Sequence, residues 1–313
     1  MTAARFAEVI HDRVVVVDGG LATELERRGN DLSSALWSAR LLSDAPDEIL
    51  AVHRSYFDAG AEVAITATYQ ASFDGFATLG YDSAEAARLM KRSVQLARRA
   101  ADARGWVAAS IGPYGAVLAD GSEYRGDYDL GVDALRRFHR PRLDVLAEAG
   151  ADVLAIETIP CLTEVEALLL ELEQLDVPAW LSISCAGTLT RAGEPAADAF
   201  TMARDATSIC AVGANCIKPA DAGALVALAT ACSGKPGVVY PNSGERWDAQ
   251  RHAWTGTPAF NPADVTSWVR SGARLVGGCC RVGPAEIARL RAAIAPRPRA
   301  GAPDRAPQPS GPA

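Results

Sequence analysis

Short apolar segments rich in β-branched residues recur eight times along this chain, and helix-like segments separate them. The apolar segments are residues 14–17, 63–68, 106–111, 153–157, 179–184, 211–215, 237–240 and 274–276. Each is apolar on both faces, which is typical of a strand buried in a parallel sheet. Residues 84–103 and 163–175 show the clearest helical spacing of charges. The alternation predicts an α/β fold, namely a (β/α)8 TIM barrel with a parallel eight-stranded sheet.

Three glycines stand just before predicted strands, at Gly60, Gly150 and Gly272. Each is suited to end a helix in the left-handed conformation before the chain enters the next strand. A doubly wound open sheet is the alternative fold. Because no GxGxxG sequence follows the first apolar segment, a dinucleotide-binding version of that alternative is disfavoured.

Length and charge narrow the remaining possibilities. Residues 1–295 are predicted to form one barrel domain, and residues 296–313, rich in Pro, Ala and Arg, a disordered tail. The net charge is 31 − 38 = −7 without a basic stripe, which disfavours nucleic acid as a partner. No apolar stretch reaches the roughly 18 residues of a membrane helix, and the first residues lack the apolar core of a secretory signal. We therefore expect a cytoplasmic protein that acts on small molecules; its oligomeric state is not predicted.

Three of the seven cysteines follow predicted strands. Cys216 follows the sixth strand, and Cys279 and Cys280 follow the eighth. In a barrel these strand ends share one rim, and three thiolates suit Zn²⁺ while leaving one tetrahedral position open for a substrate. Gly277 and Gly278 are expected to provide the sharp turn that lets adjacent cysteines reach one metal. Spacing alone equally allows a chance Cys-Cys pair with Cys216 in the core. Core packing or a surface position is expected for the other four cysteines, which are Cys161, Cys185, Cys210 and Cys232.

Two acidic residues also follow predicted strands. Asp18 follows the first strand and Glu157 closes the fourth. A carboxylate at such a position is costly unless it is paired or faces the barrel mouth, so the two are candidates for binding an ammonium group. Gly19 and Gly20 could approach a ligand closely and offer N–H groups to a carboxylate. The alternative for Asp18 is a cap on the following helix.

Polar residues stand where two further strands end. Thr66 lies in a Thr-Ala-Thr-Tyr-Gln segment after the second strand, and Asn242 in a Tyr-Pro-Asn-Ser-Gly-Glu segment after the seventh. Either segment could be ordinary turn chemistry, but the position makes both residues candidates for orienting a substrate. Two longer loops, residues 112–132 and 241–262, are expected on the same rim. The four histidines share no motif, and no GxSxG sequence is present.

Several of these segments occur together in one known family. They are DGGLATELE at 18–26, TATYQAS at 66–72, ETIP at 157–160, GANC at 213–216, YPNSGE at 240–245 and GGCCRVGP at 277–284. With them the chain resembles the homocysteine S-methyltransferase family over residues 14–290. The resemblance implies a TIM barrel, Zn²⁺ bound by Cys216, Cys279 and Cys280, and homocysteine held near Asp18 and Glu157.

The family divides by methyl donor, and this chain looks similar to the short, single-domain branch. That resemblance implies a sulfonium donor, S-methylmethionine or in some cases S-adenosylmethionine, and methionine as the product. The zinc-bound substrate thiolate would be the nucleophile, with no separate protein acid or base. Aromatic residues could hold the sulfonium by cation–π contact. The donor-side candidates are Tyr69, Gln70, Tyr114, Glu245 and Trp254.

Three other functions remain open at this point. A metal-independent lyase would need a Schiff-base lysine at a strand end, and Lys218 is near one. A zinc-storing or redox-sensing protein would use the Cys-Cys pair as a reversible disulfide. A betaine-type donor would keep the methyl transfer and change its source.

Overall fold

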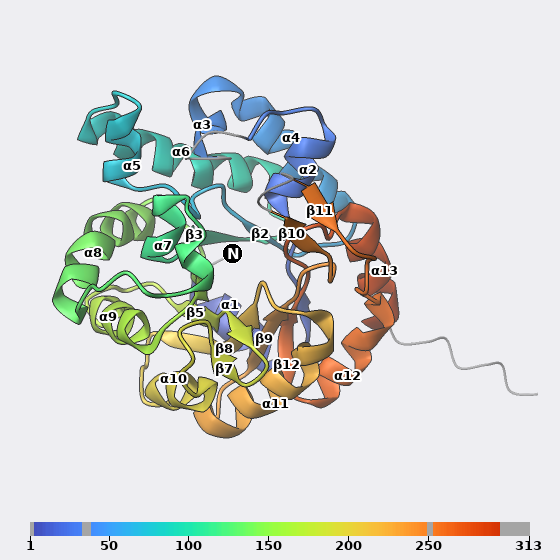
Figure 1. Ribbon diagram of the computed structural model, residues 1–313. Helices are drawn as coiled ribbons and strands as arrows, with labels where there is room; N and C mark the ends of the chain where they lie inside the picture. The colour runs from blue at the N-terminus through green and yellow to red at the C-terminus, as the bar shows by residue number, and fades with distance from the viewer. Residues whose placement is uncertain (1–2, 33–38, 249–252, 295–313) are drawn as a thin grey trace, which may run out of the picture.

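Eight parallel strands form a ring at the centre of the molecule, and helices surround it (Figure 1). The computed structural model describes residues 3–32, 39–248 and 253–294. The strands of the ring are β1 (Val15–Val16), β2 (Val63–Ile65), β3 (Trp106–Ile111), β4 (Val153–Ile159), β5 (Ala179–Ile183), β8 (Ile209–Asn215), β9 (Gly237–Tyr240) and β12 (Ala273–Val276). Every apolar segment identified in the sequence contributes one of them, so the predicted TIM barrel is confirmed.

The first two strands close the barrel. Along the sheet the order is β1-β12-β9-β8-β5-β4-β3-β2. A parallel bridge then joins Val17 to Val63, and Glu62 N donates to Val16 O at 2.7 Å. Asp18 N donates to Val63 O at 3.1 Å and completes the ring. Because all strands are parallel, their carboxyl ends lie on one rim.

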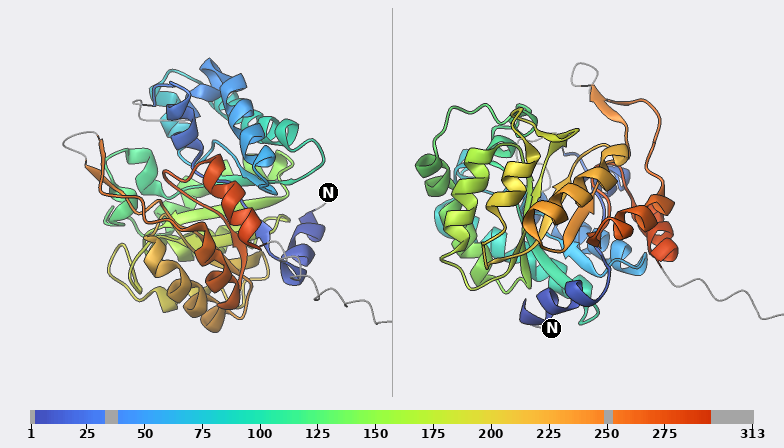
Figure 2. Two further views of the ribbon diagram at one scale, coloured as in Figure 1. Left: turned by 90° about the vertical axis from the view of Figure 1, so that its right-hand side faces the viewer. Right: turned by 90° about the horizontal axis from the view of Figure 1, so that it is seen from below.

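Helix α1 (Ala3–Asp12) covers the opposite end of the barrel. The ring of its Phe6 is fully buried, 5.7 Å from the ring of Trp106 and 6.4 Å from that of Trp180, measured between centroids. Ile10 is buried in the same cluster. Figure 2 shows α1 at the end of the molecule opposite to the hairpin of β10 (Arg246–Asp248) and β11 (Ala253–Thr255). Apolar packing thus fills the amino-terminal end of the barrel.

The outer layer is helical. Its members are α2 (Leu21–Arg27), α3 (Leu41–Asp44), α4 (Pro46–Asp58), α5 (Phe73–Thr78), α6 (Ser83–Ala101), α8 (Val132–Glu148), α9 (Leu162–Leu172), α10 (Ala196–Met202), α11 (Ala222–Ser233), α12 (Val265–Arg270) and α13 (Pro284–Ile294). Helix α6 begins with a capping box, in which Asp82 and Glu85 each accept a hydrogen bond from the other's backbone N–H. Gly60, Gly150 and Gly272 have φ of +98°, +82° and +106°, which confirms their predicted left-handed conformation.

The long segments on the rim have structure of their own. Residues 112–132, expected as a loop, contain α7 (Tyr114–Leu118) and the 3-10 helix η2 (Ser122–Tyr124). Residues 241–262 contain the hairpin of β10 and β11, and β6 (Cys185–Ala186) pairs with β7 (Leu189–Thr190) after β5. Further 3-10 helices are η3 (Pro219–Asp221) and η4 (Pro262–Asp264). The predicted disordered tail, 296–313, lies outside the described residues. No helix in the described part of the chain combines the length and apolarity needed to cross a membrane.

Candidate active site

A cavity of about 130 Å³ opens at the carboxyl-terminal rim of the barrel. Its wall combines residues from the ends of several strands, far apart in the sequence. Predicted site residues in this wall are Gly19, Gly20, Thr66, Tyr69, Gln70, Glu157, Cys216, Cys279 and Cys280. The barrel therefore brings together most of the residues that the sequence selected one strand at a time.

The three rim cysteines form one cluster. The Sγ atoms of Cys216, Cys279 and Cys280 all lie within 4.8 Å of one another, and those of Cys216 and Cys280 are 3.8 Å apart. A tetrahedral zinc with Zn–S bonds of ~2.3 Å separates its sulfur ligands by roughly 3.8 Å. The spacing of this cluster therefore fits a metal bound by three thiolates.

Backbone contacts hold these cysteines in place. Cys216 follows β8 with φ of +52°, and its N–H donates to Tyr240 O at 3.2 Å. Cys279 N donates to Pro241 O at 2.8 Å, and Cys280 N donates to the Asn242 side-chain oxygen at 3.1 Å. Asn242, predicted to orient substrate, thus supports the cysteine loop instead of standing in the cavity wall.

The two glycines before the cysteines do not form the sharp turn that the sequence predicted. Gly277 and Gly278 are not among the residues with positive φ. They are needed for space: a Cβ on Gly277 would lie 2.4 Å from Val17 Cγ2, and one on Gly278 would lie 2.1 Å from Val282 Cγ1. Close packing against Val17 of the first strand at Gly277 and against Val282 of the same loop at Gly278, and not a left-handed turn, requires glycine here.

The three thiols of the cluster shift one another's pKa values. Hydrogen bonds from the Cys279 and Cys280 thiols lower the pKa of Cys216 well below its usual range. The same contacts raise the pKa of Cys279 and Cys280. Three sulfur groups at this spacing are a donor set that a soft divalent metal would stabilise in the thiolate form by displacing their protons.

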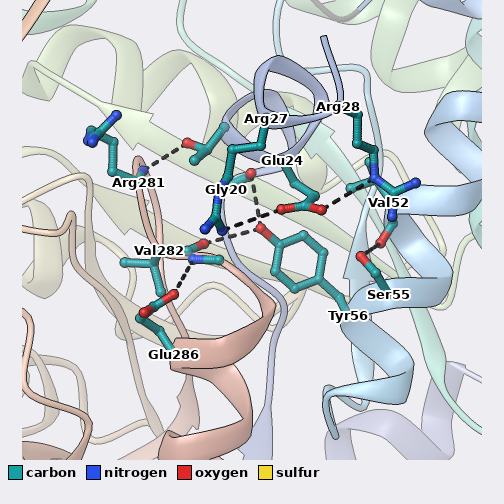
Figure 3. A network of polar contacts seen from close by, with 12 residues as sticks. Gly20, Glu24, Arg27, Arg28, Val52, Ser55, Tyr56, Arg281, Val282 and Glu286 are labelled. Carbon is teal, nitrogen blue, oxygen red and sulfur yellow. Dashed lines mark hydrogen bonds and ion pairs between the residues drawn. The ribbon is translucent and has the colours of Figure 1, made fainter. Parts of the chain in front are cut away.

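A polar network joins the loop after β1 to the loop after β12 (Figure 3). The hydroxyl of Tyr56, from α4, lies 3.0 Å from Gly20 O and 3.1 Å from Val282 O, and it donates its proton between these two carbonyls. Arg281 N donates to Thr23 Oγ1 at 2.8 Å. The network fixes the position of the cysteine loop relative to the first strand.

Asp18 lies directly behind the cavity wall and is fully buried. Ile65 N donates to its Oδ2 atom at 2.9 Å, whereas Oδ1 is buried without a hydrogen-bond partner. Burial, and to a smaller degree the nearby Glu157, raises the pKa of Asp18 well above its usual range. Gly20 and not Asp18 is the N-cap residue of α2, so the capping alternative is wrong. The N–H of Gly20 donates to Val282 O at 3.0 Å, so it is already engaged.

A bulge in β4 directs Glu157 into the mouth. The pairing of β4 with β5 shifts between Ile156 and Ile159, so the strand continues two residues beyond its predicted end. Thr158 has φ of +64°, which is unusual for a β-branched residue. Two hydrogen bonds of 2.7 Å to the Asn215 side chain hold it there. The bulge stores local strain at the cavity wall, where it positions the Glu157 side chain.

The Glu157 carboxylate is hydrogen-bonded, and within the described part of the chain it forms no ion pair with a basic residue. The Ser110 hydroxyl donates to Oε1, and the Tyr240 hydroxyl donates to Oε2 at 3.1 Å. Trp180 Nε1 donates in turn to the Tyr240 oxygen at 3.0 Å. Burial outweighs these hydrogen bonds and raises the pKa of Glu157 to about 7. A cation beside it would favour the ionised form.

The residues after β2 contribute both structure and cavity wall. Strand β2 ends at Ile65, three residues before its predicted end, because Thr66 and Thr68 hydrogen-bond to each other at 2.7 Å and Thr66 accepts from Ser110 N at 3.0 Å. Gln70 donates to Ala116 O at 3.1 Å and so links this segment to α7. Thr66 and Gln70 line the cavity with their hydrogen-bonding groups already partly engaged.

Other donor-side candidates lie away from the cavity wall. The ring of Tyr114 packs edge-on against Tyr128 with 5.3 Å between centroids. The carboxylate of Glu245 pairs with Arg281 at 2.7 Å. Trp254 belongs to β11, and its side chain lies outside the part of the chain that the structure describes. The structure thus does not bring Tyr114 or Glu245 into the wall of this cavity.

The wall residues that were not singled out in the sequence include Glu123, Tyr124 and Tyr240. The Tyr124 hydroxyl lies 3.2 Å from Cys216 Sγ, and the Arg191 guanidinium lies 5.4 Å from the centroid of the Tyr124 ring. Glu123 and Tyr124 stand in the long segment expected on this rim. Nothing in the local pattern distinguishes them from the other polar residues of that segment, so the sequence offered no signal for them.

A family model, two similar proteins and a similar solved structure are described as homocysteine methyltransferases. A family model described as homocysteine S-methyltransferase matches residues 15–294. Homocysteine S-methyltransferase YbgG of Bacillus subtilis is 45% identical over 296 residues, covering 89% of this chain and 94% of that protein. The homocysteine S-methyltransferase of Escherichia coli is 44% identical over 293 residues, covering 89% and 94%. The solved structure of the homocysteine methyltransferase MmuM from Escherichia coli in its metallated form has a TM-score of 0.81 and 42% identity, covering 90% of this chain and 96% of that one.

Proposed function

This chain belongs to the homocysteine S-methyltransferase family, and we propose that it transfers a methyl group from a sulfonium donor to the homocysteine thiol, giving methionine. One observation carries the proposal: three thiols within 4.8 Å of one another share a cavity with the buried carboxylate of Glu157. The thiol cluster could bind a metal that activates the substrate sulfur. The Glu157 carboxylate could bind the ammonium group of an amino-acid substrate. The names of the relatives support the reaction, and the metallated form of one of them, MmuM, supports a metal at the cysteines.

Zinc is the metal that we propose for Cys216, Cys279 and Cys280. Three soft thiolate donors favour Zn²⁺, and three protein ligands leave one position for a substrate. When bound there, Zn²⁺ would act as a Lewis acid that lowers the pKa of the homocysteine thiol and keeps its sulfur nucleophilic at neutral pH. Tyr124, 3.2 Å from Cys216 Sγ, would donate a hydrogen bond to that thiolate and help to keep its orientation.

The buried carboxylates would hold the amino-acid end of homocysteine. Asp18 offers an Oδ1 atom without a partner, and Glu157 is oriented by Ser110 and Tyr240. Burial chiefly, and repulsion by Glu157 to a smaller degree, raises the pKa of Asp18, and an ammonium group between these carboxylates would offset both. Gly19 and Thr66, which line the same wall, are our proposed contacts for the rest of the amino acid.

The protein's work in the transfer is alignment. The homocysteine sulfur forms a bond to the methyl carbon as the bond from that carbon to the donor sulfur breaks, and the electron pair of the broken bond stays on the donor sulfur. The donor therefore leaves as a neutral thioether, and no protein acid has to protonate it. A partly enclosed cavity that positions both sulfurs and excludes water supplies the rate enhancement.

For the donor we propose S-methylmethionine, with S-adenosylmethionine as the other sulfonium to test. Tyr69 and Tyr124 line the cavity and present aromatic rings, which attract a sulfonium by cation–π contact. Gln70 lines the cavity as well, whereas Tyr114 and Glu245 would act only through the residues that they contact. Betaine, which carries an ammonium in place of the sulfonium, is the third donor to compare.

The Schiff-base alternative lacks a suitable lysine. The chain has three lysines, Lys91, Lys218 and Lys235, and none of them lines the cavity. Lys218 is exposed at the start of η3. A reducing compartment such as the cytoplasm fits the proposed chemistry, because oxidation of neighbouring thiols would remove metal ligands.

The test is direct. Protein, Zn²⁺ and homocysteine are incubated with S-methylmethionine, S-adenosylmethionine or betaine, and methionine is measured. We expect methionine with a sulfonium donor, and separate Cys216→Ser, Cys279→Ser and Cys280→Ser variants are expected to lose both zinc and activity. Absence of methionine with all three donors contradicts the proposed function. Full activity of a cysteine variant after chelation contradicts the metal site.

A further inference from the structure

We infer that the Glu123 carboxylate binds the positive charge of the methyl donor, opposite the carboxylates that hold the amino-acid substrate. The inference rests on the proposed function and names a residue that neither the sequence motifs nor the cysteine cluster indicates. Glu123 belongs to η2, the short helix in the rim segment after β3, and it lines the same cavity as the three cysteines.

The state of this side chain is unusual for a glutamate. Only 7% of Glu123 is exposed, and its Oε2 atom is buried without a hydrogen-bond partner. A buried carboxylate without a partner is costly, and a structure retains one where a ligand completes it. Burial raises the pKa of Glu123, so a cation that enters the cavity gains a partner and favours its ionised form.

The surrounding chain holds Glu123 in this position. A Cβ on Gly115 of α7 would lie 2.5 Å from Glu123 N, so only glycine lets α7 and η2 pack this closely. Ser122 N donates to the Asp120 side chain at 2.9 Å and fixes the start of η2. The nearby guanidinium of Arg125 donates to Ser122 Oγ at 3.0 Å and to Asp127 at 3.1 Å. Among the described residues Arg125 forms no ion pair with Glu123, although its charge lowers the pKa of Glu123 to a smaller degree than burial raises it.

The balance of charge in the cavity supports two separate cation positions. None of the described residues that line it is basic. Its two acidic wall residues differ: Glu157 is oriented by Ser110 and Tyr240, whereas Glu123 has an oxygen with no partner. The proposed reaction brings two positive groups, the homocysteine ammonium and the donor sulfonium. Glu157 together with Asp18 would take the first, which leaves Glu123 for the second.

This role predicts a specific kinetic effect. The sulfonium charge is full in the bound donor and disappears as the methyl group departs, so the attraction to Glu123 is stronger before the transfer than after it. An interaction of this kind strengthens donor binding and releases the neutral thioether, and it does not accelerate the chemical step. Its loss should therefore raise the KM for the donor without lowering kcat, because the bound donor loses more stabilisation than the transition state.

The experiment compares Glu123→Gln with the wild-type enzyme, both loaded with Zn²⁺. We expect the KM for S-methylmethionine to rise by about 30-fold or more, as for loss of one partner of a buried charge pair. The dissociation constant of homocysteine and the zinc content should not change. Glu123→Asp, which keeps the charge, should recover part of the affinity. The matched control is Glu166→Gln, the same chemical change at an exposed position on α9.

A second donor shows which of the two cationic groups of S-methylmethionine, the sulfonium or the ammonium, Glu123 binds. A trialkylsulfonium ion has no ammonium group, so its binding to the wild-type enzyme and to Glu123→Gln reports on the sulfonium alone. We expect the same fold loss of affinity as for S-methylmethionine. Loss for S-methylmethionine alone would assign Glu123 to the donor ammonium and overturn the inference.

Two further outcomes would also overturn it. An unchanged donor KM in Glu123→Gln shows that the carboxylate does not bind the donor. A parallel loss of zinc or of homocysteine affinity shows that Glu123 supports the rim segment and not the donor. These outcomes are distinct from failure of the proposed function, which would appear as a wild-type enzyme that makes no methionine from any sulfonium.

Discussion

At the scale of single residues, Glu157 combines burial with a proposed role that requires charge. Its pKa is raised to about 7, chiefly by burial, and it must be ionised to pair with an ammonium group. Hydrogen bonds from Ser110 and Tyr240 favour the ionised form but do not offset burial. Substrate binding is therefore expected to depend on pH within the physiological range.

Below pH 7, binding of an amino acid should weaken as Glu157 takes up a proton. We expect the dissociation constant of 2-aminobutyrate, which has the ammonium but no thiol, to rise by up to about tenfold per pH unit between pH 7 and pH 5.5. Titration calorimetry on the zinc-loaded enzyme measures this. Glu157→Gln should bind weakly at every pH. A wild-type dissociation constant that does not vary over this range contradicts the assignment.

His53 of α4 is a buried residue that the proposed function does not use. Both ring nitrogens lack hydrogen-bond partners, and burial lowers the pKa of His53 to about 4. The unfolded chain, with an ordinary histidine pKa of about 6.5, binds the proton more readily. The free energy of unfolding is therefore highest above pH 6.5 and falls as the pH drops from 6.5 to 4.

His53→Leu should remove that pH dependence. The difference between the two pKa values corresponds to roughly 3 kcal/mol of unfolding free energy, and most of it should be lost by the wild-type protein between pH 7 and pH 4. Urea denaturation at pH 7 and pH 5 is the measurement, and the variant should lose less stability than the wild type. His11→Gln, at an exposed position on α1, is the control. Equal losses in wild type and His53→Leu would contradict the prediction.

At the scale of elements, the loop after β12 depends on contacts with the loop after β1. Gly277 gives the space for Val17, and Tyr56 of α4 joins the carbonyls of Gly20 and Val282. Gly278 gives the space for Val282 within the loop after β12. The motif containing the cysteines was visible in the sequence. Its glycines were assigned to a turn because a sequence pattern does not reveal which backbone approaches from another strand.

Gly278→Ala should displace the cysteines and lower metal content. The new Cβ would lie 2.1 Å from Val282 Cγ1 and 2.4 Å from its Cβ, so the backbone has to shift. We expect less than one zinc per chain by elemental analysis and weaker retention against a chelator. Gly131→Ala, where a Cβ meets nothing within 4 Å, is the matched control. Recovery of zinc in Gly278→Ala with Val282→Gly, which removes every close side-chain atom, would support the steric cause; full zinc content in the single variant would refute it.

At the scale of the whole molecule, the barrel is closed at one end by packing and open at the other. Phe6 and Ile10 of α1 are buried against Trp106 and Trp180 inside the amino-terminal end. The cavity with the cysteines lies at the opposite rim. Stability and chemistry are thus separated along the barrel axis, as expected for this fold.

Phe6→Ala should therefore destabilise the fold without altering the site. Removal of a fully buried aromatic ring costs about 3–5 kcal/mol. Chemical denaturation should show this loss, while KM and kcat at a temperature where the variant stays folded should match the wild type. Leu79→Ala, at a side chain that is 43% exposed, should cost far less. Similar losses in the two variants, or an altered KM, would contradict the separation of stability from chemistry.

The sequence by itself determined the barrel and most of its rim. Apolar segments recurring between helices indicate parallel strands, and parallel strands place their carboxyl ends together whatever the loops do. For that reason Asp18, Glu157 and the three cysteines could be assigned to one site before any contact was known. The bulge at Thr158 and the early end of β2 could not be predicted from the sequence, since both depend on hydrogen bonds to residues from other strands.

Only the tertiary structure decided which residues complete the cavity. Glu123 and Tyr124 reach it because α7 and η2 pack together at Gly115, and Tyr124 meets Cys216 across 92 residues of sequence. Periodicity reports which face of an element is buried, but it does not report how an irregular segment folds over a rim. The conformation of such a segment follows from contacts distant in sequence, so the proposed donor-binding carboxylate became recognisable only once those contacts were present.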